Sequence, residues 1–333
     1  MSGSLIAVLM CAAFAAVYVT TLIVVAHLFT TPRRVTPPAP PAGTSDAVTR
    51  VQFFARNDTV QLAAWYLPAP SATSAVIFVH GRDGCRGDEL RSDTFRLAQR
   101  MVSHGMSVLM LDLRGHGESD RARLTFGRRE RHDVLGAVDF LLARGYQPTR
   151  IGVLGASMGG ASVIAAAAEE TAIGAMVTDS SFADLGDLLR AQFTRLTRLP
   201  TCFLAGALVV ARVLTGEHLT RNSPQQNMRR MGGRPSLVIH AENDPFVPVE
   251  HAHSLASAGN AQLWITRGDR HLASLRTVGV EYDNVVATFF VEHLRPRTME
   301  RGVAPPMQLI DDTRRRAAVA VHQRAQRPSA ARR

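Results

Sequence analysis

The sequence Gly155-Ala156-Ser157-Met158-Gly159 decides how the rest of the chain is interpreted. An aliphatic, β-branched run, Ile151–Leu154, precedes it, and an alanine-rich stretch typical of a helix follows it. This order predicts a strand, a sharp turn and a helix. Glycines two residues before and after the serine leave room for a strained backbone between closely packed elements. We expect the turn to present the Ser157 hydroxyl at a sheet edge. The alternative is an ordinary glycine-rich turn after a buried strand, with no catalytic role.

Length and composition favour a globular α/β protein. The 333 residues allow one large α/β domain with additional segments, or two small domains, and 46% of them are hydrophobic, which is enough for a sizeable core. The net charge is +10, and all 38 basic Lys or Arg positions hold arginine. Cys11, Cys85 and Cys202 lie far apart without a CxxC spacing, so we expect neither a disulfide framework nor a zinc site. We expect no metal ion or organic cofactor.

Residues 4–29 form an apolar run that contains no Asp, Glu, Arg or Lys. It is long enough to cross a hydrocarbon core of about 30 Å as a helix, so we predict a single-pass transmembrane anchor. A cleaved signal peptide is the alternative. It is disfavoured because no basic residue precedes the run and Val24–Leu28 is a poor cleavage site. Arg33 and Arg34 follow the run, which by the positive-inside rule favours a membrane protein with a cytoplasmic body.

Residues 30–46 are predicted to be a Pro-rich linker between the anchor and the body. The stretch from Pro32 to Gly43 suits neither a helix nor a central strand. It indicates an extended, polyproline-like spacer that holds the body off the bilayer.

Strands and helices alternate along the body, residues 47–294. Two β-rich runs separated by Asn57-Asp58 predict an antiparallel hairpin at a sheet edge. The expected strands are Val48–Phe54, Val60–Tyr66, Ala75–Val79, Ser107–Leu111, Ile151–Leu154, Ala175–Thr178, Ser236–His240 and Gln262–Thr266. The expected helices include Asp93–His104, Arg131–Leu142 and Val278–Leu294. This alternation predicts a doubly wound α/β fold, with a mostly parallel central sheet and helices on both faces.

Three motifs together make residues 47–294 resemble the α/β-hydrolase superfamily. His80-Gly81 follows a buried strand and resembles the oxyanion-hole loop of that family, although an ordinary βα turn is the alternative. The stretch Asp112–Ser119 is similar to its D-x-R-G-x-G-x-S turn, and Gly155–Gly159 matches its nucleophile elbow. The resemblance is closest to membrane-anchored bacterial hydrolases related to serine aminopeptidases and esterases. It implies the α/β-hydrolase fold.

The resemblance also implies a catalytic triad in the chain order Ser, Asp, His. Asp244 follows a predicted strand and takes the position of the acid. His271 follows the last predicted strand and takes the position of the base. Ser157, Asp244 and His271 are therefore the predicted catalytic residues, with Glu242 and Asp269 as competing acids.

The resemblance implies an oxyanion hole made of the backbone N–H groups of Met158 and Arg82. The Arg82 side chain either biases the mouth of the site toward acidic or polar acyl groups or lies in solvent. His80 and His116 precede the elbow, where the family has no base, so we expect them to structure loops. Asp179 is expected to be structural, with a role as alternative acid left open.

Residues 182–234 are too many for an ordinary loop, so we predict a helical cap insertion over Ser157. A helical stripe runs from Leu185 to Leu196 and includes Gln192. Cys202–Leu214 is strongly apolar but too short and, with Arg212, too charged for a second span. We expect the cap to supply an apolar acyl pocket. Core packing alone is the alternative, and a cap facing the bilayer would also admit lipid-like substrates.

Residues 295–333 contain ten arginines and three acidic residues, a difference of +7. We predict a disordered basic tail with a short helix around Asp312 to Gln323. Attraction to anionic lipids fits this charge, and a solvated tail without a partner is the alternative. Binding to nucleic acid is disfavoured, because no aromatic-interleaved or helix-turn-helix pattern accompanies the charge.

These features predict a membrane-anchored serine hydrolase that cleaves carboxylic esters through an acyl-enzyme intermediate. Its expected partners are a small-molecule or lipid-like ester substrate and the membrane. A peptidase or a thioesterase of the same fold is the alternative within the enzyme class. A non-catalytic, hydrolase-like binding module tethered to the membrane is the alternative outside it. Such a module would be favoured by a His271 ring turned away from Ser157.

Overall fold

A computed structural model describes residues 3–41, 47–91, 93–221, 223–231 and 233–295. The chain divides into two units, Met1–Arg295 and Pro296–Arg333. Apart from Arg295, the predicted basic tail lies outside the described residues, as do residues 42–46 of the predicted linker.

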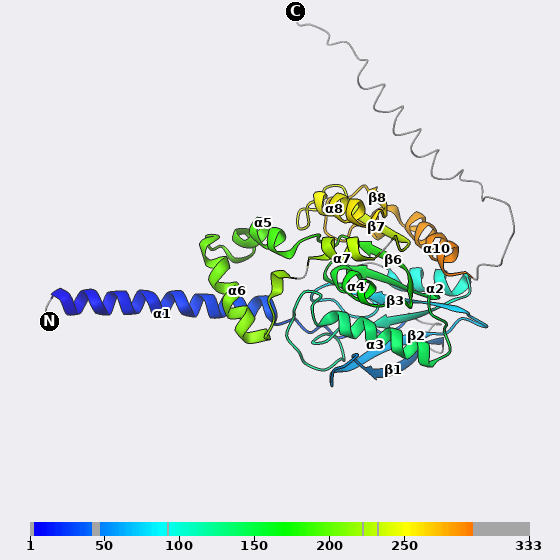
Figure 1. Cartoon of the computed structure of the whole chain (residues 1–333), viewed down its shortest axis with the longest axis horizontal. Coiled ribbons are helices and arrows are strands. Elements are labelled where there is room, and N and C mark those ends of the chain that lie inside the picture. The colour runs from blue at the N-terminus through cyan, green and yellow to red at the C-terminus, as the bar shows by residue number, and fades with distance from the viewer. Residues whose placement is uncertain (1–2, 42–46, 92, 222, 232, 296–333) are drawn as a thin grey trace, which may run out of the picture. The chain divides into compact units, whose positions relative to one another are not determined.

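Among the residues that the structure describes, a mostly parallel sheet of eight strands forms the centre of the first unit (Figure 1). The strands are β1 (Thr49–Phe54), β2 (Gln61–Leu67), β3 (Ser74–Val79), β4 (Met106–Leu111), β5 (Ile151–Ala156), β6 (Ile173–Asp179), β7 (Ser236–Ala241) and β8 (Gln262–Thr266). Their order in the sheet is β1-β2-β4-β3-β5-β6-β7-β8. The strand β2 pairs antiparallel with β1 and β4, and all other pairs are parallel. The predicted α/β fold and edge hairpin are confirmed.

Burial explains the composition of the strands. Every residue of β3, β4, β5 and β7 is buried, because helices cover both faces of the sheet. A strand buried on both faces is apolar at nearly every position, as the run Ser-Ala-Val-Ile-Phe-Val of β3 is. The edge strand β1 is instead exposed or half-buried along its length.

Helices cover both faces of the sheet (Figure 1). They are α2 (Thr94–Ser103), α3 (Glu130–Ala143), α4 (Met158–Glu169), α8 (Glu250–Gly259), α9 (Ser274–Val278) and α10 (Val280–Leu294), besides those described below. Val76 and Phe78 of β3 belong to the core cluster that contains buried side chains of α2 and α10. Ile77 belongs to the opposite cluster, with side chains of α3 and α4. Alternate residues of one strand therefore fill two cores.

The last predicted helix differs from the observed one. The sequence predicts a single helix over residues 278–294, but α9 ends at Val278 and α10 begins at Val280. Gly279 between them has φ of +59°, which interrupts the helical backbone.

The described part of the predicted insertion, residues 182–221, 223–231 and 233–234, holds four helical segments. These are α5 (Leu185–Thr197), α6 (Cys202–Thr215), the 3₁₀ helix η2 (Leu219–Arg221) and α7 (Pro224–Arg230). The helix α7 packs against α4 and α8 and belongs to the layer on the sheet. The axes of α5 and α6 meet at a bend of 105°, and α6 packs against α1 (Gly3–Thr30).

Within the described residues, α1 is the one unbroken helix that is long and apolar enough to cross a membrane. Its carboxyl end is part of the body, since Ala26 and Thr30 are fully buried. The Phe29 ring meets the Phe193 ring of α5 edge to face, with 6.1 Å between their centroids.

The segment after α1 differs from the predicted Pro-rich spacer. Residues 31–34 do not form a free spacer, because they lie on the body directly after the helix. Leu124 N donates to Thr30 O at 2.7 Å, and the Arg34 guanidinium donates to Gly117 O and Ser119 O, each at 2.6 Å. The first of these hydrogen bonds satisfies a carbonyl at the helix end, where intrahelical partners are lacking, and the other two tie Arg34 to the loop after β4. The body therefore lies at the end of α1 rather than at the end of a linker.

Candidate active site

The turn between β5 and α4 holds Ser157 in a strained conformation. Its backbone has φ of 52° and ψ of −116°, which is rare for a residue other than glycine. The turn is held by Ser157 N, which donates to Asp179 O at 2.8 Å. A Cβ on Gly155 would collide with the backbone of Gly159, and one on Gly159 would collide with the carbonyl groups of Val79 and His80. The glycines permit this close packing.

The structure brings Ser157, His271 and Asp244 together, although they come from three separate loops. The Ser157 hydroxyl lies 2.8 Å from His271 Nε2. On the other side of the imidazole ring, Nδ1 lies 2.7 Å from Asp244 Oδ2. With Nδ1 protonated and donating to the carboxylate, Nε2 is free to accept from the serine hydroxyl. This chain of hydrogen bonds has the geometry that proton transfer from the serine requires.

The Asp244 carboxylate is fixed on both of its oxygens. Oδ1 accepts from Phe246 N at 2.8 Å and from Val247 N at 3.0 Å, while Oδ2 faces His271. Burial raises the pKa of Asp244, but its hydrogen bonds and the charge of His271 outweigh that effect, so the pKa is lowered. The Phe246 ring lies edge-on to the His271 ring at 5.1 Å and restricts its orientation. The site therefore contains an ionised acid and an oriented base.

The competing acids lie elsewhere. Glu242 and Asp269 are exposed. Asp179 is buried and accepts from Ser180 Oγ at 2.8 Å and from Tyr282 OH at 3.0 Å. Burial raises the pKa of Asp179 to about 6. The Asp179 side chain thus connects Ser180 and Tyr282, and its backbone carbonyl accepts from Ser157 N.

The loop that was expected to form the oxyanion hole lies against Ser157. A Cβ built on Gly81 would stand 3.1 Å from Ser157 Cβ and 3.7 Å from Ser157 Oγ. Arg82 follows Gly81 directly, and Met158 is the first residue of α4, where N–H groups lack intrahelical acceptors. The two predicted donor residues thus lie directly after Ser157 and directly after Gly81, which adjoins Ser157. Their role as donors stays a prediction.

His80 and His116 join the Gly81 loop to the loop that follows β4. His80 Nε2 accepts from Leu113 N at 3.0 Å, and its Nδ1 donates to Gly81 O at 2.6 Å. His116 Nε2 accepts from Asp83 N at 3.2 Å. Burial lowers the pKa of each imidazole to about 4, so both rings are neutral at pH 7. The expectation that these histidines structure loops is confirmed.

The comparisons with known proteins agree with this fold. A family model described as serine aminopeptidase, S33, matches residues 70–230. The esterase Pf2001 of Pyrococcus furiosus has the same fold, with a TM-score of 0.65 and 23% identity over 80% of this chain and 100% of its own. The chain has the α/β-hydrolase fold.

Two curated bacterial relatives of this hydrolase align over most of its body. The uncharacterized protein YfhR of Salmonella typhimurium is 25% identical over 228 residues, which cover 65% of this chain and 72% of YfhR. The uncharacterized protein YqkD of Bacillus subtilis is 27% identical over 230 residues, which cover 67% of this chain and 73% of YqkD.

The Arg82 side chain of the hydrolase binds the carboxyl end of α1. Its Nη2 donates to Leu28 O at 2.7 Å. Beside it, Arg33 N donates to Asp83 Oδ1 at 2.8 Å. The expectations of a substrate-facing or a solvated arginine were therefore wrong, because carbonyl groups at the helix end need donors. The loop next to Ser157 is tied to the membrane-anchor candidate.

Gln192 is a residue whose role the sequence analysis missed. It is buried in α5, and its Nε2 donates to the carbonyls of Phe246 at 2.8 Å and Pro245 at 3.2 Å. It thereby holds the loop that carries Asp244. A polar residue within the apolar stripe of α5 was the signal that could have indicated this contact.

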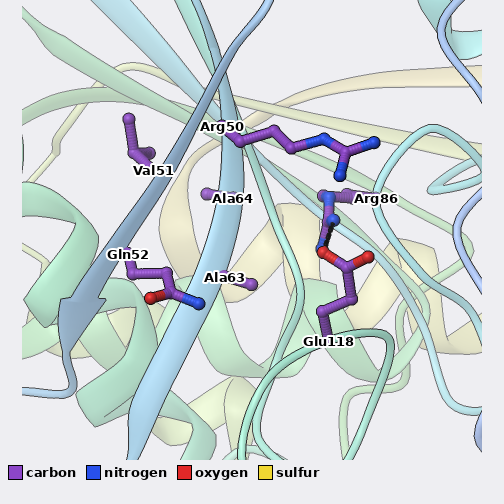
Figure 2. Close-up of a pocket in the computed structure, with 7 residues that line it drawn as sticks. All are labelled: Arg50, Val51, Gln52, Ala63, Ala64, Arg86 and Glu118. Atoms are coloured by element: carbon purple, nitrogen blue, oxygen red, sulfur yellow. Dashed lines mark hydrogen bonds and ion pairs between the residues drawn. The ribbon is translucent and has the colours of Figure 1, made fainter.

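One described pocket of about 310 Å³ lies on the side of β1 and β2 (Figure 2). It is lined by Arg50, Val51, Gln52, Ala63, Ala64, Arg86 and Glu118. The Arg86 guanidinium is paired with Glu118 in this pocket, and also with the buried Asp112. The pocket includes none of Ser157, Asp244 and His271. Among the described residues, no group of three or more His, Cys, Asp or Glu side chains could hold a metal ion.

Proposed function

We propose that this hydrolase is a membrane-anchored serine hydrolase that cleaves carboxylic esters through an acyl-enzyme intermediate. The observation that carries the proposal is the continuous chain of hydrogen bonds from Ser157 through His271 to Asp244. It occurs at a strained turn, in a chain with the α/β-hydrolase fold. Ester hydrolysis fits the esterase fold of the structural neighbour, although that likeness supports the fold alone.

In this mechanism His271 acts as general base and then as general acid. A serine hydroxyl is a weak nucleophile, so Nε2 of His271 takes its proton while Ser157 Oγ attacks the ester carbonyl. The imidazolium that forms is stabilised by the Asp244 carboxylate, which also holds the Nδ1–H tautomer. His271 then protonates the leaving alcohol. Water, activated by the same imidazole, hydrolyses the acyl-enzyme.

The proposed oxyanion hole stabilises the tetrahedral intermediate. The negative oxygen that develops on the carbonyl would accept from the N–H groups of Met158 and Arg82. Loss of one such donor typically costs about 3 kcal/mol of transition-state stabilisation. The contact of Gly81 with Ser157 supports this placement, because it brings the loop so close to the serine that little room is left for a side chain at residue 81.

The proposed anchor is α1, with the body on the cytoplasmic side. Its length of 28 residues corresponds to about 42 Å, more than the hydrocarbon thickness of about 30 Å. The packing of Ala26 and Phe29 into the body supports a retained helix over a cleaved signal peptide. The orientation rests on Arg33 and Arg34.

A peptidase is the second candidate function. It is favoured by the match of residues 70–230 to the family model described as serine aminopeptidase. The chemistry of attack is the same, and the leaving group is an amine rather than an alcohol. The binding-module alternative loses its expected support, because the His271 ring faces Ser157.

The decisive experiment is labelling of the detergent-solubilised protein with a fluorophosphonate probe, which reacts with activated serines. We expect labelling of the wild type, none of Ser157→Ala, and strongly reduced labelling of His271→Ala. Ser103→Ala, at the exposed end of α2, and His253→Ala, on the exposed face of α8, are matched controls that should label normally.

Substrate panels then separate the candidates. Hydrolysis of p-nitrophenyl esters with little cleavage of aminoacyl p-nitroanilides supports the esterase, and the reverse supports the peptidase. A folded wild-type protein that does not react with the probe would refute both the esterase and the peptidase. The non-catalytic binding module would then be the favoured function.

A further inference from the structure

The helix α6 is apolar on both of its faces. Its inner face consists of Leu204, Ala207, Ala211 and Thr215, which are buried. Its outer face carries Val209 and Val213, whose residues are 64% and 79% exposed. A helix that faces water normally carries polar residues on its outer side. An apolar outer face instead suits a helix that contacts lipid.

The helix α6 packs directly on α1 (Figure 1), through a side that carries Phe203 and Gly206. The rings of Tyr18 and Phe203 lie 5.0 Å apart between centroids. Farther along, a Cβ on Gly206 would stand 2.7 Å from Leu22 Cδ1, so the glycine allows the two helices to approach closely. Small residues at helix contacts are typical of helices that pack within a bilayer.

The exposed surface of α1 continues past the level at which α6 packs. Val19, Ile23 and Leu28 are exposed, while Leu22 and Val25 of the same turns are buried in the body. The exposed residues Val19 and Ile23 lie in the same turns of α1 as Tyr18 and Leu22, which contact α6. Lipid that covers the exposed side of α1 would therefore reach the level of α6. The outer face of α6 then adjoins lipid as well.

Cations lie near both ends of α6. Arg198, in the turn before the helix, and Arg212, in its last turn, are exposed. Arginines flanking an apolar face are typical of helices in the membrane interface, where the guanidinium reaches the headgroups. Anionic headgroups complement this charge.

We propose that α6 is a second membrane contact of this protein, seated in the bilayer interface beside α1 with Val209 and Val213 facing the acyl chains. The inference rests on the proposed anchoring by α1. It adds that the predicted cap is itself a lipid-bound surface. The helix α5, which continues into α6, holds the loop of Asp244 through Gln192, so the membrane contact adjoins the candidate site.

The test measures how deeply nitroxide labels lie in vesicles of phosphatidylcholine and phosphatidylglycerol that contain the full-length protein. Two native cysteines are exposed, Cys11 on α1 and Cys202 at the start of α6, whereas Cys85 is buried. Each exposed cysteine is labelled after the other is replaced by serine. With both replaced, Val213→Cys reports on the outer face of α6, and the exposed Gln147→Cys is the aqueous control.

Oxygen concentrates in lipid and the nickel chelate stays in water, so a high ratio of oxygen accessibility to nickel-chelate accessibility indicates a label in lipid. We expect this ratio to be several-fold higher at positions 202 and 213 than at 147, and also higher at 11 than at 147. A lipid-like value at 11 with water-like values at 202 and 213 would overturn the inference while leaving the anchor intact. Low accessibility to both reagents at 213 would also overturn it, because a protein surface such as a second copy would then cover α6. Water-like values at all positions would refute the anchor and the inference together.

Discussion

At the scale of single residues, the candidate site depends on one ring held between two groups. The His271 imidazole is fixed by Asp244 on Nδ1 and by the edge of Phe246, so that Nε2 faces Ser157. Both oxygens of Asp244 are used, and only one of them serves His271. Replacing the acid should therefore disturb the ring without unfolding the loop.

The substitution Asp244→Asn tests this dependence. The amide oxygen keeps an acceptor for the backbone N–H groups of Phe246 and Val247, but the charge is lost and the wrong tautomer of His271 is favoured. We expect kcat on a soluble p-nitrophenyl ester to fall about 10³- to 10⁴-fold with little change in KM. Glu242→Gln, in the same loop but exposed, should remain active. Equal losses in both variants would contradict the assignment of the acid.

A second residue-scale prediction concerns pH. Burial lowers the pKa of His116 from 6.5 to about 4. Between these values the unfolded chain binds a proton that the folded chain does not, so the free energy of unfolding falls as the pH falls. The loss of stability that His116 causes between pH 8 and pH 5 is about 2 kcal/mol. No such loss exists at pH 8, where the imidazole is neutral in both states.

The comparison of the wild type with His116→Gln isolates this contribution from the other titrating groups. The glutamine side chain of the variant does not titrate, so the wild type should lose about 2 kcal/mol more stability than the variant between pH 8 and pH 5. Urea unfolding at the two pH values measures the difference. Parallel losses in both proteins would show that His116 does not carry the effect.

At the scale of elements, the close contact between α1 and α6 depends on a glycine of α6. Gly206 faces Leu22 of α1, whereas Ala205 beside it is exposed. Gly206→Leu should overfill the contact and lower the free energy of unfolding in detergent by about 1–3 kcal/mol. Ala205→Leu, with a side chain of the same size, should change it little. Thermal unfolding distinguishes the two, and equal shifts would argue against tight packing of these helices.

At the scale of the whole molecule, α1 is part of the folded body as well as the proposed anchor. Its side chains Leu22, Val25 and Phe29 are buried, and burial of such side chains contributes about 1.5–3 kcal/mol each. The last turn also binds Arg82, next to the proposed oxyanion hole. An anchor attached by a free spacer would have neither property.

Removal of residues 1–30 should therefore impair the enzyme in detergent, where no membrane is needed. We expect a lower unfolding temperature and a lower rate on a soluble ester, because the body loses apolar contacts comparable to its whole stability of about 5–15 kcal/mol. A milder variant, Arg82→Met, should keep the fold and the backbone N–H of residue 82. A truncated chain with unchanged stability and activity would contradict the integration of α1.

Much of the fold followed from the sequence because strands and helices are local patterns. Fully apolar runs such as Ala75–Val79 predicted strands buried on both faces, and the helix of residues 131–142 followed from its one apolar face. Helix ends were harder, since a single glycine, Gly279, splits the last one.

The sequence by itself determined the α/β-hydrolase fold, the apolar helix α1 and the identity of the residues that meet at the candidate site. The order of motifs carried that information, because the ends of parallel strands converge at one edge of a sheet. Only the tertiary structure decided that Arg82 binds the end of α1, that Arg34 binds the loop after β4 and that α6 packs on α1. These contacts join residues distant in sequence, and no periodicity encodes which carbonyl a guanidinium meets. They depend on which carbonyl groups and apolar faces lack a partner once the rest of the chain has packed.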